Sequence, residues 1–354
     1  MASGLLLTSG KSQATQLNDA DEWFMPAEGE PHKCTWMGFG GSKRIWGREL
    51  LPEVRRNLAL IANTIAQYES VVMLVRPEEI KLARKLLSRE VEILESPLDD
   101  LWLRDTGPVF VINEEGEKAA LNFNFNGWGE KQDYRYDAEV AGRIAQAAGV
   151  PEIVTDLVLE GGCIEVDGHG SAIITESCVL NKNRNPGVSK AEFEDLLMPL
   201  LGLDKIIWLQ GIKGMDITDG HTDFYARFVK PGVVLAGYDP DPESYDHKVT
   251  LQHLELLKQA TDAKGKPLQV SVLQGPDRIP SGYDIESFAA GYIGYYECND
   301  AIIMQAFGDK RADRAAREVI QNAFPEREIE QIRIDGIAAG GGSIHCATQQ
   351  EPLV

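Results

Sequence analysis

The feature that most limits the fold is the alternation of amphipathic and short apolar segments along almost the whole chain. Apolar residues recur at helical spacing at about 50–68, 77–88, 136–148, 189–201, 244–261 and 309–323. Short apolar runs typical of strands lie between them, at 70–75, 108–112, 163–166, 171–174, 224–229, 232–236, 268–273 and 300–305. Strands that alternate with helices are typical of α/β proteins, so we expect an α/β fold.

The chain shows no internal boundary after its first residues. Residues 1–20 are small and polar, and we expect a flexible N-terminal arm there. No linker rich in Ser, Gly or Pro and no run of charges divides residues 21–354. Although 354 residues would suit two domains of roughly 150 residues each, we predict a single catalytic α/β domain over 21–354.

A polar turn precedes several of the apolar segments. Asp105, Glu160 and His221 each lie just before such a segment, and a glycine-rich turn precedes Cys346. The separations between successive members are 55, 61 and 125 residues, and the last is about twice 62. This spacing predicts a module of ~55–65 residues repeated about five times around an axis, with each module presenting its turn to one centre.

The charge balance excludes some classes of partner. The chain has 55 Asp and Glu against 35 Lys and Arg, which gives a formal net charge of −20. Proteins that bind nucleic acid are expected to carry a basic patch, so we expect no nucleic acid partner. An acidic balance serves solubility and also raises the local concentration of small cationic ligands.

No segment suggests a membrane or an oxidising compartment. The apolar runs fall short of the ~18 residues that span a bilayer, and the leucines at 5–7 are too few for a signal peptide. The five cysteines are scattered without a CxxC pair, which argues against zinc ribbons and thioredoxin-like chemistry. We therefore expect a cytoplasmic protein with free thiols, one of which could be a nucleophile.

Cys346 is the candidate nucleophile. It follows three consecutive glycines at 340–342, and each glycine inside a helix or strand would cost ~1 kcal/mol relative to alanine. Such a triplet suits a backbone that turns sharply or approaches a ligand closely. A thiol just beyond this turn is either a nucleophile held over a pocket or a small buried residue of a C-terminal strand.

His221 is the candidate general acid and base. If residues 219–223 are extended, the side chains of His221 and Asp223 point to the same side, as an acid–base pair requires. The pair would also suit a metal ion, but no second His-rich segment supports that interpretation. We interpret His169 as solvent-exposed and His345 as a strand-face residue, neither with a function.

Asp105 and Glu160 complete a coherent set. Taken singly, each is a turn carboxylate beside Gly or Pro. With Cys346, His221 and Asp223 they make one thiol, one imidazole and three carboxylates. Carboxylates raise the pKa of a thiol unless a cation enters, and a guanidinium is the cation that pairs bidentately with carboxylates. Because the guanidinium carbon is a weak electrophile that needs such clamping, the set points to guanidine chemistry.

The sequence resembles the agmatine deiminases (agmatine iminohydrolases), in the peptidyl-arginine-deiminase-type branch of the guanidino-group-modifying superfamily. The matching segments run in order through nearly the whole chain, at 25–28, 30–32, 102–108, 159–162, 180–186, 218–223, 306–309 and 340–352. The resemblance implies a five-bladed pseudo-symmetric α/β propeller, the pentein fold, without a metal or organic cofactor. It also suggests a homodimer.

The resemblance further implies a role for each residue of the set. Cys346 would attack the guanidinium carbon to form a covalent amidino intermediate, and His221 would protonate the leaving ammonia and then activate water. Asp105 and Asp223 would hold the guanidinium nitrogens, and Glu160 would bind substrate and orient His221. The expected reaction converts agmatine and water to N-carbamoylputrescine and ammonia, a step of putrescine and polyamine biosynthesis. We expect the substrate site to include also Trp102, Gly341 and Gly342.

Several positions depart from the pattern of this family. Gly29 stands where Trp is common, Gly291 and Gly294 lie in a segment that lacks the usual Ser and Asn, and Ser343 replaces Asn or Gly. Residues 215–217 are less acidic than is usual. None of these departures falls on the five chemical residues, so they bear on the far end of the substrate rather than on the reaction.

The sequence alone therefore leaves alternatives open for both the substrate and the class of reaction. Arginine carries a carboxylate that an Arg would bind, and the sequence alone places none of Arg44, Arg48, Arg184 or Arg227 in the site. A deiminase of arginine, of peptidyl-arginine or of another guanidine stays open, as does an amidinotransferase with an amine in place of water. The alternatives of other kinds are a Cys-dependent amidase or protease and a non-catalytic protein that binds guanidines or polyamines.

Overall fold

The computed structural model describes residues 22–283 and 287–354, and it confirms the α/β class. The arm expected at 1–20 lies outside the described residues. One sheet has four strands, in the order β16 (Thr348–Pro352), β1 (His32–Phe39), β2 (Val71–Val75) and β3 (Val91–Glu95). The other sheets of the described residues have three strands each: β4 (Val109–Ile112), β5 (Lys118–Asn122) and β6 (Glu152–Val154); β7 (Ile164–Val166), β8 (Ser171–Thr175) and β9 (Lys205–Leu209); β10 (Ala226–Lys230), β11 (Val233–Tyr238) and β12 (Gln269–Gln274); β13 (Tyr296–Cys298), β14 (Ala301–Ala306) and β15 (Glu328–Arg333).

The same pairing pattern recurs in every one of these sheets. The first strand pairs antiparallel with the second, and the second pairs parallel with the third. In the four-stranded sheet the first strand is β16, from the C-terminal end of the chain, and β3 is an added parallel strand. A parallel pair needs a crossover, and helices supply it. The crossover helices are α1 (Lys43–Ile65), α2 (Ile80–Leu86), α5 (Val140–Ala148), α7 (Lys190–Leu201), α8 (His247–Gln259) and α9 (Lys310–Ala323).

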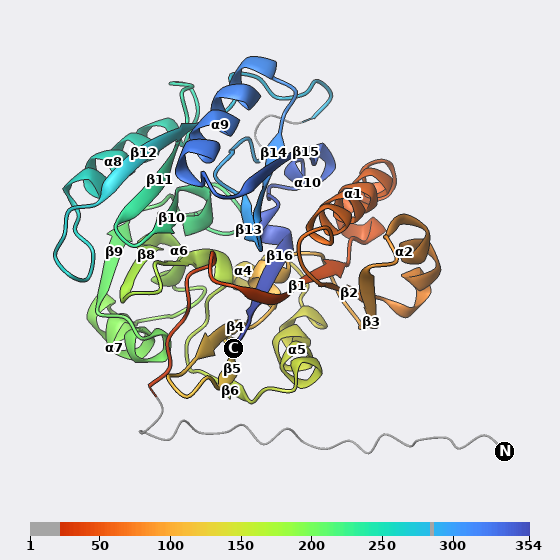
Figure 1. Ribbon diagram of the computed structural model, residues 1–354, viewed down its shortest axis with the longest axis horizontal. Helices are drawn as coiled ribbons and strands as arrows, with labels where there is room; N and C mark the ends of the chain where they lie inside the picture. Colours follow the sequence, from red (N-terminus) through yellow and green to blue (C-terminus); the bar gives the residue numbers. More distant parts are fainter. Residues whose placement is uncertain (1–21, 284–286) are drawn as a thin grey trace.

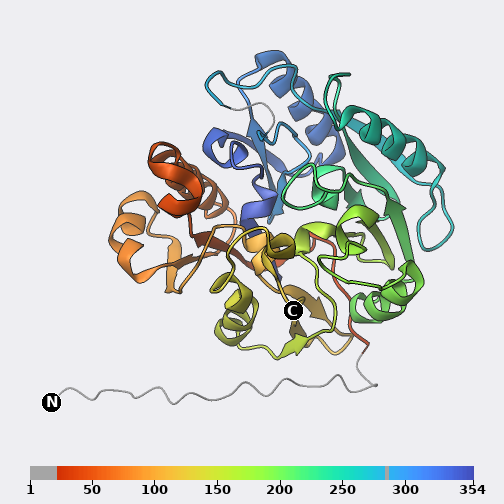
Figure 2. The ribbon, with the colours of Figure 1, turned by 180° about the vertical axis from the view of Figure 1, so that it is seen from behind.

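The crossover helices lie on the periphery, and β16 lies near the middle of the molecule (Figure 1). The view from behind gives the same arrangement (Figure 2). Each helix buries an apolar face against its own sheet; in α1 the buried residues include Leu51, Leu58 and Ile65. Such burial removes apolar area from water and holds helix and sheet together.

Local signals explain where several helices begin and end. Ser189 and Glu192 form a capping box at the start of α7, and Gly202 ends that helix in a left-handed conformation. Asp309 caps α9 by accepting hydrogen bonds from the backbone amides of residues 311 and 312. In α1, Gly47 has a φ of 68°, so the helix is kinked near its start.

Every helix and strand expected from periodicity is present, with shifted ends. The helix expected at 50–68 is α1, which begins earlier, at Lys43, and the one expected at 77–88 is a 3₁₀ turn, η1 (Pro77–Glu79), followed by α2. The segment at 163–166 begins with a 3₁₀ turn before β7. Sequence patterns missed eight of the described strands: β1, β3, β5, β6, β9, β13, β15 and β16.

A short helical turn precedes the first strand of four sheets, and this feature positions the site. α3 (Leu103–Thr106) leads to β4, η3 (Gly161–Cys163) to β7, η4 (Thr222–Phe224) to β10 and η5 (His345–Ala347) to β16. These turns correspond to the polar turns that the sequence spacing predicts. η3 lies against both α3 and η4, and η5 lies against α3, so the four turns meet.

The buried carboxylate of Glu28 ties these turns together. It accepts hydrogen bonds from Arg104 Nη2 of α3 (3.0 Å), Arg227 Nη2 of β10 (2.8 Å) and the backbone amide of Glu297 in β13 (2.9 Å). Its Oε2 also lies 2.8 Å from Nε2 of His345 in η5. Burial alone would raise the pKa of Glu28, but Arg227, His345 and Arg104 hold it well below its ordinary value. One ionised side chain thus links the turns α3 and η5 to the strands β10 and β13.

None of the helices in residues 22–283 and 287–354 combines the length and the apolar character that crossing a bilayer requires.

We predict that Glu28→Ala lowers the free energy of unfolding by about 3–5 kcal/mol, because removing one partner of a buried ion pair leaves uncompensated charge. Urea unfolding followed by tryptophan fluorescence measures the loss. Glu30→Ala is the matched control, since Glu30 is exposed two residues away. Equal losses in the two variants would contradict the role given to Glu28.

Candidate active site

Cys346 lies at the centre of the site. It sits in the middle of η5, and only 5% of the residue is exposed. Its Sγ lies 3.2 Å from Ser343 Oγ and 3.7 Å from Asp223 Oδ2. Burial, Asp223 and Asp105 raise the pKa of this thiol well above its ordinary value, against the hydrogen bonds from Ser343. The resting side chain is therefore a neutral thiol.

Asp223 presents one occupied and one free carboxylate oxygen. Its Oδ2 lies 2.7 Å from Nδ1 of His345, whereas its Oδ1 is buried and has no hydrogen-bond partner among the described residues. Burial would raise the pKa of Asp223, but the hydrogen bond and the charge of His345 lower it. A buried acceptor without a donor costs free energy, so this oxygen suits a ligand that brings an N–H group.

His221 lies between two carboxylates. Its Nε2 is 3.0 Å from Glu160 Oε2, and its Nδ1 is 3.7 Å from Asp105 Oδ1. Burial acts to lower the pKa of His221, but Asp105 and hydrogen bonds to Cys178 and Glu160 raise it well above its ordinary value. The imidazole is therefore held as an imidazolium, which is an acid ready to donate a proton.

Glu160 is anchored on its other side by Arg184. The guanidinium of Arg184 donates from Nε to Glu160 Oε1 (2.8 Å) and from Nη2 to Oε2 (3.3 Å). Burial raises the pKa of Glu160, but the hydrogen bond to His221 and the charge of Arg184 outweigh it and bring the pKa to about 2. Glu160 is thus a fixed anion that orients the imidazole ring.

Asp105 faces both His221 and the open cavity. Trp128 Nε1 donates to its Oδ2 (2.9 Å), and the backbone amide of Gly162 donates to its Oδ1 (3.3 Å). Burial raises the pKa of Asp105 to about 6, although His221 acts to lower it. A carboxylate of this kind is easily neutralised by protons and gains most from a cationic partner.

A cavity of about 210 Å³ opens onto the thiol. Asp105 and Cys346 line it together with the rings of Trp46, Trp102 and Trp128. The charged residues of the lining are Asp100 and Asp105, and both are acidic. The remaining lining residues are Ile45, Leu50, Gln132, Ile217, Thr218, Phe224, Ala339, Gly340, Gly341 and Gly342.

The glycine triplet lets the chain pass against two of these rings. A Cβ on Gly340 would lie 2.1 Å from the Trp46 ring, and a Cβ on Gly342 would lie 2.2 Å from the Trp102 ring. Gly341 has a φ of 86°, a conformation that favours glycine. The triplet therefore serves close packing of the loop that carries Cys346, as its composition suggests.

The four arginines considered as partners for a substrate carboxylate lie outside the cavity lining. Arg184 pairs with Glu160 and Asp219, and Arg227 pairs with Glu28 and Glu165. Arg44, in the first turn of α1, forms an exposed ion pair with Asp133. Arg48 is exposed. Among residues 22–283 and 287–354, the cavity lining thus offers no basic side chain to a ligand carboxylate.

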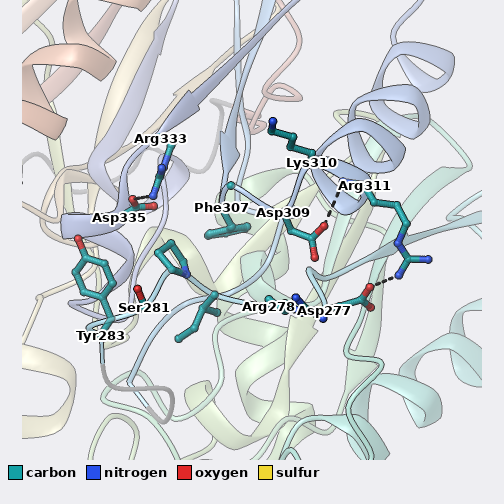
Figure 3. A pocket seen from close by; sticks show the side chains of 13 residues that line it. Asp277, Arg278, Ser281, Tyr283, Phe307, Asp309, Lys310, Arg311, Arg333 and Asp335 are labelled. Atoms are coloured by element: carbon teal, nitrogen blue, oxygen red, sulfur yellow. Dashed lines mark hydrogen bonds and ion pairs between the residues drawn. The ribbon is translucent and has the colours of Figure 1, made fainter.

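A second, larger hollow of about 750 Å³ lies between the 277–283 loop and the start of α9 (Figure 3). Four of its charged side chains form two ion pairs, Arg311 with Asp277 and Arg333 with Asp335. Its lining, as far as the structure describes it, includes neither a cysteine nor a histidine, whereas the first cavity is lined by Cys346.

The structure brings together the residues that the sequence singles out. Cys346, His221, Glu160, Asp105 and Asp223 are all buried; Cys346 contacts Asp223, and His221 contacts Glu160 and Asp105. Asp105 and Cys346 line one cavity together with Trp102, Gly341 and Gly342.

Two expectations about these residues are wrong. The segment after His221 is a 3₁₀ turn, not extended, so His221 reaches Glu160 whereas Asp223 reaches His345. His345 does not lie on a strand face, because it is buried in the 3₁₀ turn η5 between Asp223 and Glu28.

Sequence reasoning also missed Trp128 and the pairing of Arg184 with Glu160. Trp128 has a φ of 56°, and no local pattern indicates that its ring turns inward to Asp105. Ser343, one of the departures, hydrogen bonds to the thiol, and a Cβ on Gly294 would lie 2.3 Å from the Cβ of Ser343. Gly294 and Ser343 are therefore neighbours, and the Ser343 side chain occupies the space that a side chain at position 294 would need.

Known proteins are similar to this chain in sequence and in fold. Residues 24–352 match the family described as Porphyromonas-type peptidyl-arginine deiminase. A curated relative from Streptomyces coelicolor, named "Putative agmatine deiminase", is 38% identical over 335 residues, which cover 93% of this chain and 98% of that relative. A relative of the same name from Latilactobacillus sakei is 36% identical over 354 residues and is covered to 96%. The solved structure of the agmatine deiminase of Enterococcus faecalis has a TM-score of 0.91 at 32% identity, with 97% of this chain and 100% of that chain covered.

We predict that Gly342→Ala lowers the free energy of unfolding by about 1–3 kcal/mol, because the new methyl group overlaps the Trp102 ring. Thermal or urea unfolding measures the effect. Gly291→Ala is the control, since a Cβ there meets only a side-chain methyl of Ile293 at 3.8 Å. A Gly342→Ala protein as stable as the control would contradict the packing argument.

Proposed function

Because this chain belongs to the Porphyromonas-type peptidyl-arginine deiminase family, we propose that it is a hydrolase that converts agmatine and water to N-carbamoylputrescine and ammonia. Its named relatives support the reaction class, and the chemistry of the site supports the substrate. The product would place the protein in putrescine and polyamine biosynthesis.

The observation that carries the proposal is a neutral buried thiol facing carboxylates across a cavity without a basic lining residue. A guanidinium fits this site because Asp105 and the free Oδ1 of Asp223 can each accept N–H groups from it. Its positive charge also favours the thiolate of Cys346, so the substrate itself activates the nucleophile.

The first half of the reaction uses Cys346 and His221. As the cation enters, Cys346 Sγ releases its proton to solvent, and the resulting thiolate forms a bond to the guanidinium carbon, which becomes tetrahedral. The C–N bond to one terminal nitrogen then breaks, and the imidazolium of His221 donates the proton with which that nitrogen leaves as ammonia. The product of this half is an amidino group held on sulfur.

The second half reverses the proton flow. Water attacks the same carbon, and His221, now neutral, accepts a proton from it. The C–S bond breaks, N-carbamoylputrescine is released, and Cys346 regains its proton. Glu160 positions His221 through both halves, because Arg184 fixes the carboxylate from the far side.

The lining favours agmatine over arginine. Agmatine ends in an ammonium, which carboxylates and aromatic rings stabilise, and the cavity offers Asp100 and the rings of Trp46 and Trp102. Arginine and peptidyl-arginine bring a carboxylate or an amide instead, and no basic side chain of the lining is present to receive a carboxylate. An amidinotransferase would need a second amine in the place of water.

We also propose that residues 21–354 form one catalytic domain, a five-bladed pseudo-symmetric propeller. The repeated antiparallel-then-parallel pairing supports it, because each sheet would then be one blade with its helical turn directed to the centre. In this arrangement β16 completes the first blade by pairing with β1, and Cys346 lies in η5 directly before β16. The cytoplasmic location and the homodimer stay predictions from the sequence.

We predict that purified protein releases ammonia from agmatine and that Cys346→Ala abolishes this release while substrate binding persists, since the clamp is intact. Ammonia is measured with agmatine, arginine and a peptidyl-arginine in parallel. Cys298→Ala, which removes another buried thiol, is the control and should keep its activity. Turnover of agmatine by Cys346→Ala near the wild-type rate would contradict the assignment of Cys346 as the nucleophile. Ammonia release from arginine alone would show that arginine, not agmatine, is the substrate.

We predict an acid limb in kcat/KM for agmatine near pH 6. The pKa of Asp105 is raised to about 6, so the carboxylate is charged above that pH and loses its attraction for a cation as the pH falls through it. The guanidinium stabilises the charged form, so the limb in kcat should lie at lower pH.

A matched variant tells which carboxylate causes this limb. The pKa of Asp100 is likewise raised to about 6 by burial, and Asp100 also lines the cavity. Asp105→Asn should lower kcat/KM and remove the limb, whereas Asp100→Asn should keep it. A limb that survives in Asp105→Asn and disappears in Asp100→Asn would contradict the assignment.

A further inference from the structure

A group of four reactive side chains includes His221 and Glu160 together with two cysteines. The two cysteines, Cys163 at the end of η3 and Cys178 in α6 (Glu176–Val179), face the carboxylate of Glu160. Both are fully buried, as are Glu160 and His221. The proposed mechanism uses His221 and Glu160 but not the cysteines.

The four side chains converge on a small volume. Glu160 Oε2 lies 3.0 Å from His221 Nε2, 3.3 Å from Cys163 Sγ and 3.5 Å from Cys178 Sγ. The two sulfurs are 2.8 Å apart, and all four atoms lie within 4.8 Å of one another. Zinc holds sulfur at ~2.3 Å and nitrogen or oxygen at ~2.0–2.2 Å, so its tetrahedral ligands are separated by about 3.3–3.8 Å. The cluster matches this size once the sulfurs move slightly apart.

Charge and donor type also suit a thiophilic metal ion. Two thiolates, an imidazole and a carboxylate are the ligands that zinc takes in proteins. The two sulfurs, the imidazole nitrogen and the carboxylate oxygen already face one another, so the donor atoms are in place for an ion that displaces the thiol protons. Two thiolates and Glu160 carry three negative charges, which balance a divalent ion together with Arg184.

The scaffold around the cluster is firmly tied. Thr222 Oγ1 donates to the carbonyl of Cys163 (2.7 Å) and accepts from the backbone amide of Thr175 (3.1 Å), which joins η4 to the turn η3 and to the strand β8. Arg184 holds Glu160 through a short hydrogen bond from Nε to Oε1 (2.8 Å) and a longer one from Nη2 to Oε2 (3.3 Å), so the carboxylate is fixed with Oε2 directed at the two thiols and His221. A preorganised set of this kind loses little conformational entropy on binding.

We propose that Glu160, Cys163, Cys178 and His221 form a binding site for a divalent thiophilic metal ion such as Zn²⁺, and that the bound ion inhibits the enzyme. The inhibition rests on the proposed function, because the ion occupies Nε2 of His221 and the carboxylate that orients it. The ion displaces the thiol protons of Cys163 and Cys178 and the Nε2 proton of His221, so binding weakens as the pH falls.

A direct test uses Co²⁺ as the probe in the Cys346→Ala protein. This variant keeps the four ligands and removes the thiol of the active site, so absorption from sulfur bound to cobalt reports on Cys163 and Cys178. We expect thiolate-to-cobalt charge-transfer absorption and the strong visible bands of tetrahedral Co²⁺, with one ion per chain and displacement by Zn²⁺. The further change Cys163→Ala should abolish the bands, whereas Cys298→Ala should keep them.

The activity arm uses protein with an intact Cys346, freed of metal by a chelator. Zn²⁺ should inhibit ammonia release from agmatine, and the chelator should restore it. Cys163→Ala should raise the Zn²⁺ concentration that gives half-maximal inhibition by roughly 10–100-fold. The activity of each variant is expressed relative to its own metal-free rate. Cys298→Ala should keep the wild-type midpoint.

The outcomes separate the two proposals. Cobalt bands without ammonia release would leave the metal site standing and overturn the proposed reaction. Ammonia release in a protein whose Cys346→Ala form shows no thiolate bands would overturn the metal site and leave the reaction standing. A disulfide between Cys163 and Cys178 in the purified protein, found because the thiols react only after reduction, would also overturn the metal site.

Discussion

The arrangement of the site depends on the buried ion pairs that surround Glu28. This carboxylate joins Arg104, Arg227 and His345, which come from α3, β10 and η5. His345 in turn holds Asp223, whose Oδ2 lies beside the thiol of Cys346. Charges buried this deeply are stable only when they are paired and hydrogen-bonded, so the network permits little displacement of the turns that carry it. The position of the nucleophile is thus set by electrostatics as much as by packing.

The same burial makes the resting site unreactive. Burial and the carboxylates of Asp223 and Asp105 raise the pKa of Cys346, so the thiol is protonated until a cation arrives. A guanidinium removes this obstacle, because it neutralises the carboxylates and favours the thiolate. Selectivity for cations follows from this dependence. Neutral amides, the substrates of a protease, would supply no such charge.

The sequence predicts the chemistry better than the connections. Cys346 and His221 stand out through local signals, a glycine triplet and an acidic neighbour, and the spacing of polar turns predicts that they share one centre. The contact between His345 and Glu28 spans 317 positions, and no local pattern reports it. Trp128 reaches Asp105 only through a left-handed backbone that propensity does not predict. Strands were missed where charged or polar residues interrupt the alternation, as in β16, because their burial comes from other sheets.

The central claim is that Cys346 forms a covalent bond to the guanidinium carbon. Mass spectrometry of protein quenched in acid during turnover of agmatine tests it most directly, with peptide mapping to locate the modification. We predict a mass gain equal to agmatine less ammonia, on the peptide that contains Cys346 and absent from Cys346→Ala. A quenched protein that turns over agmatine yet carries no adduct, or carries it on another residue, would contradict the account.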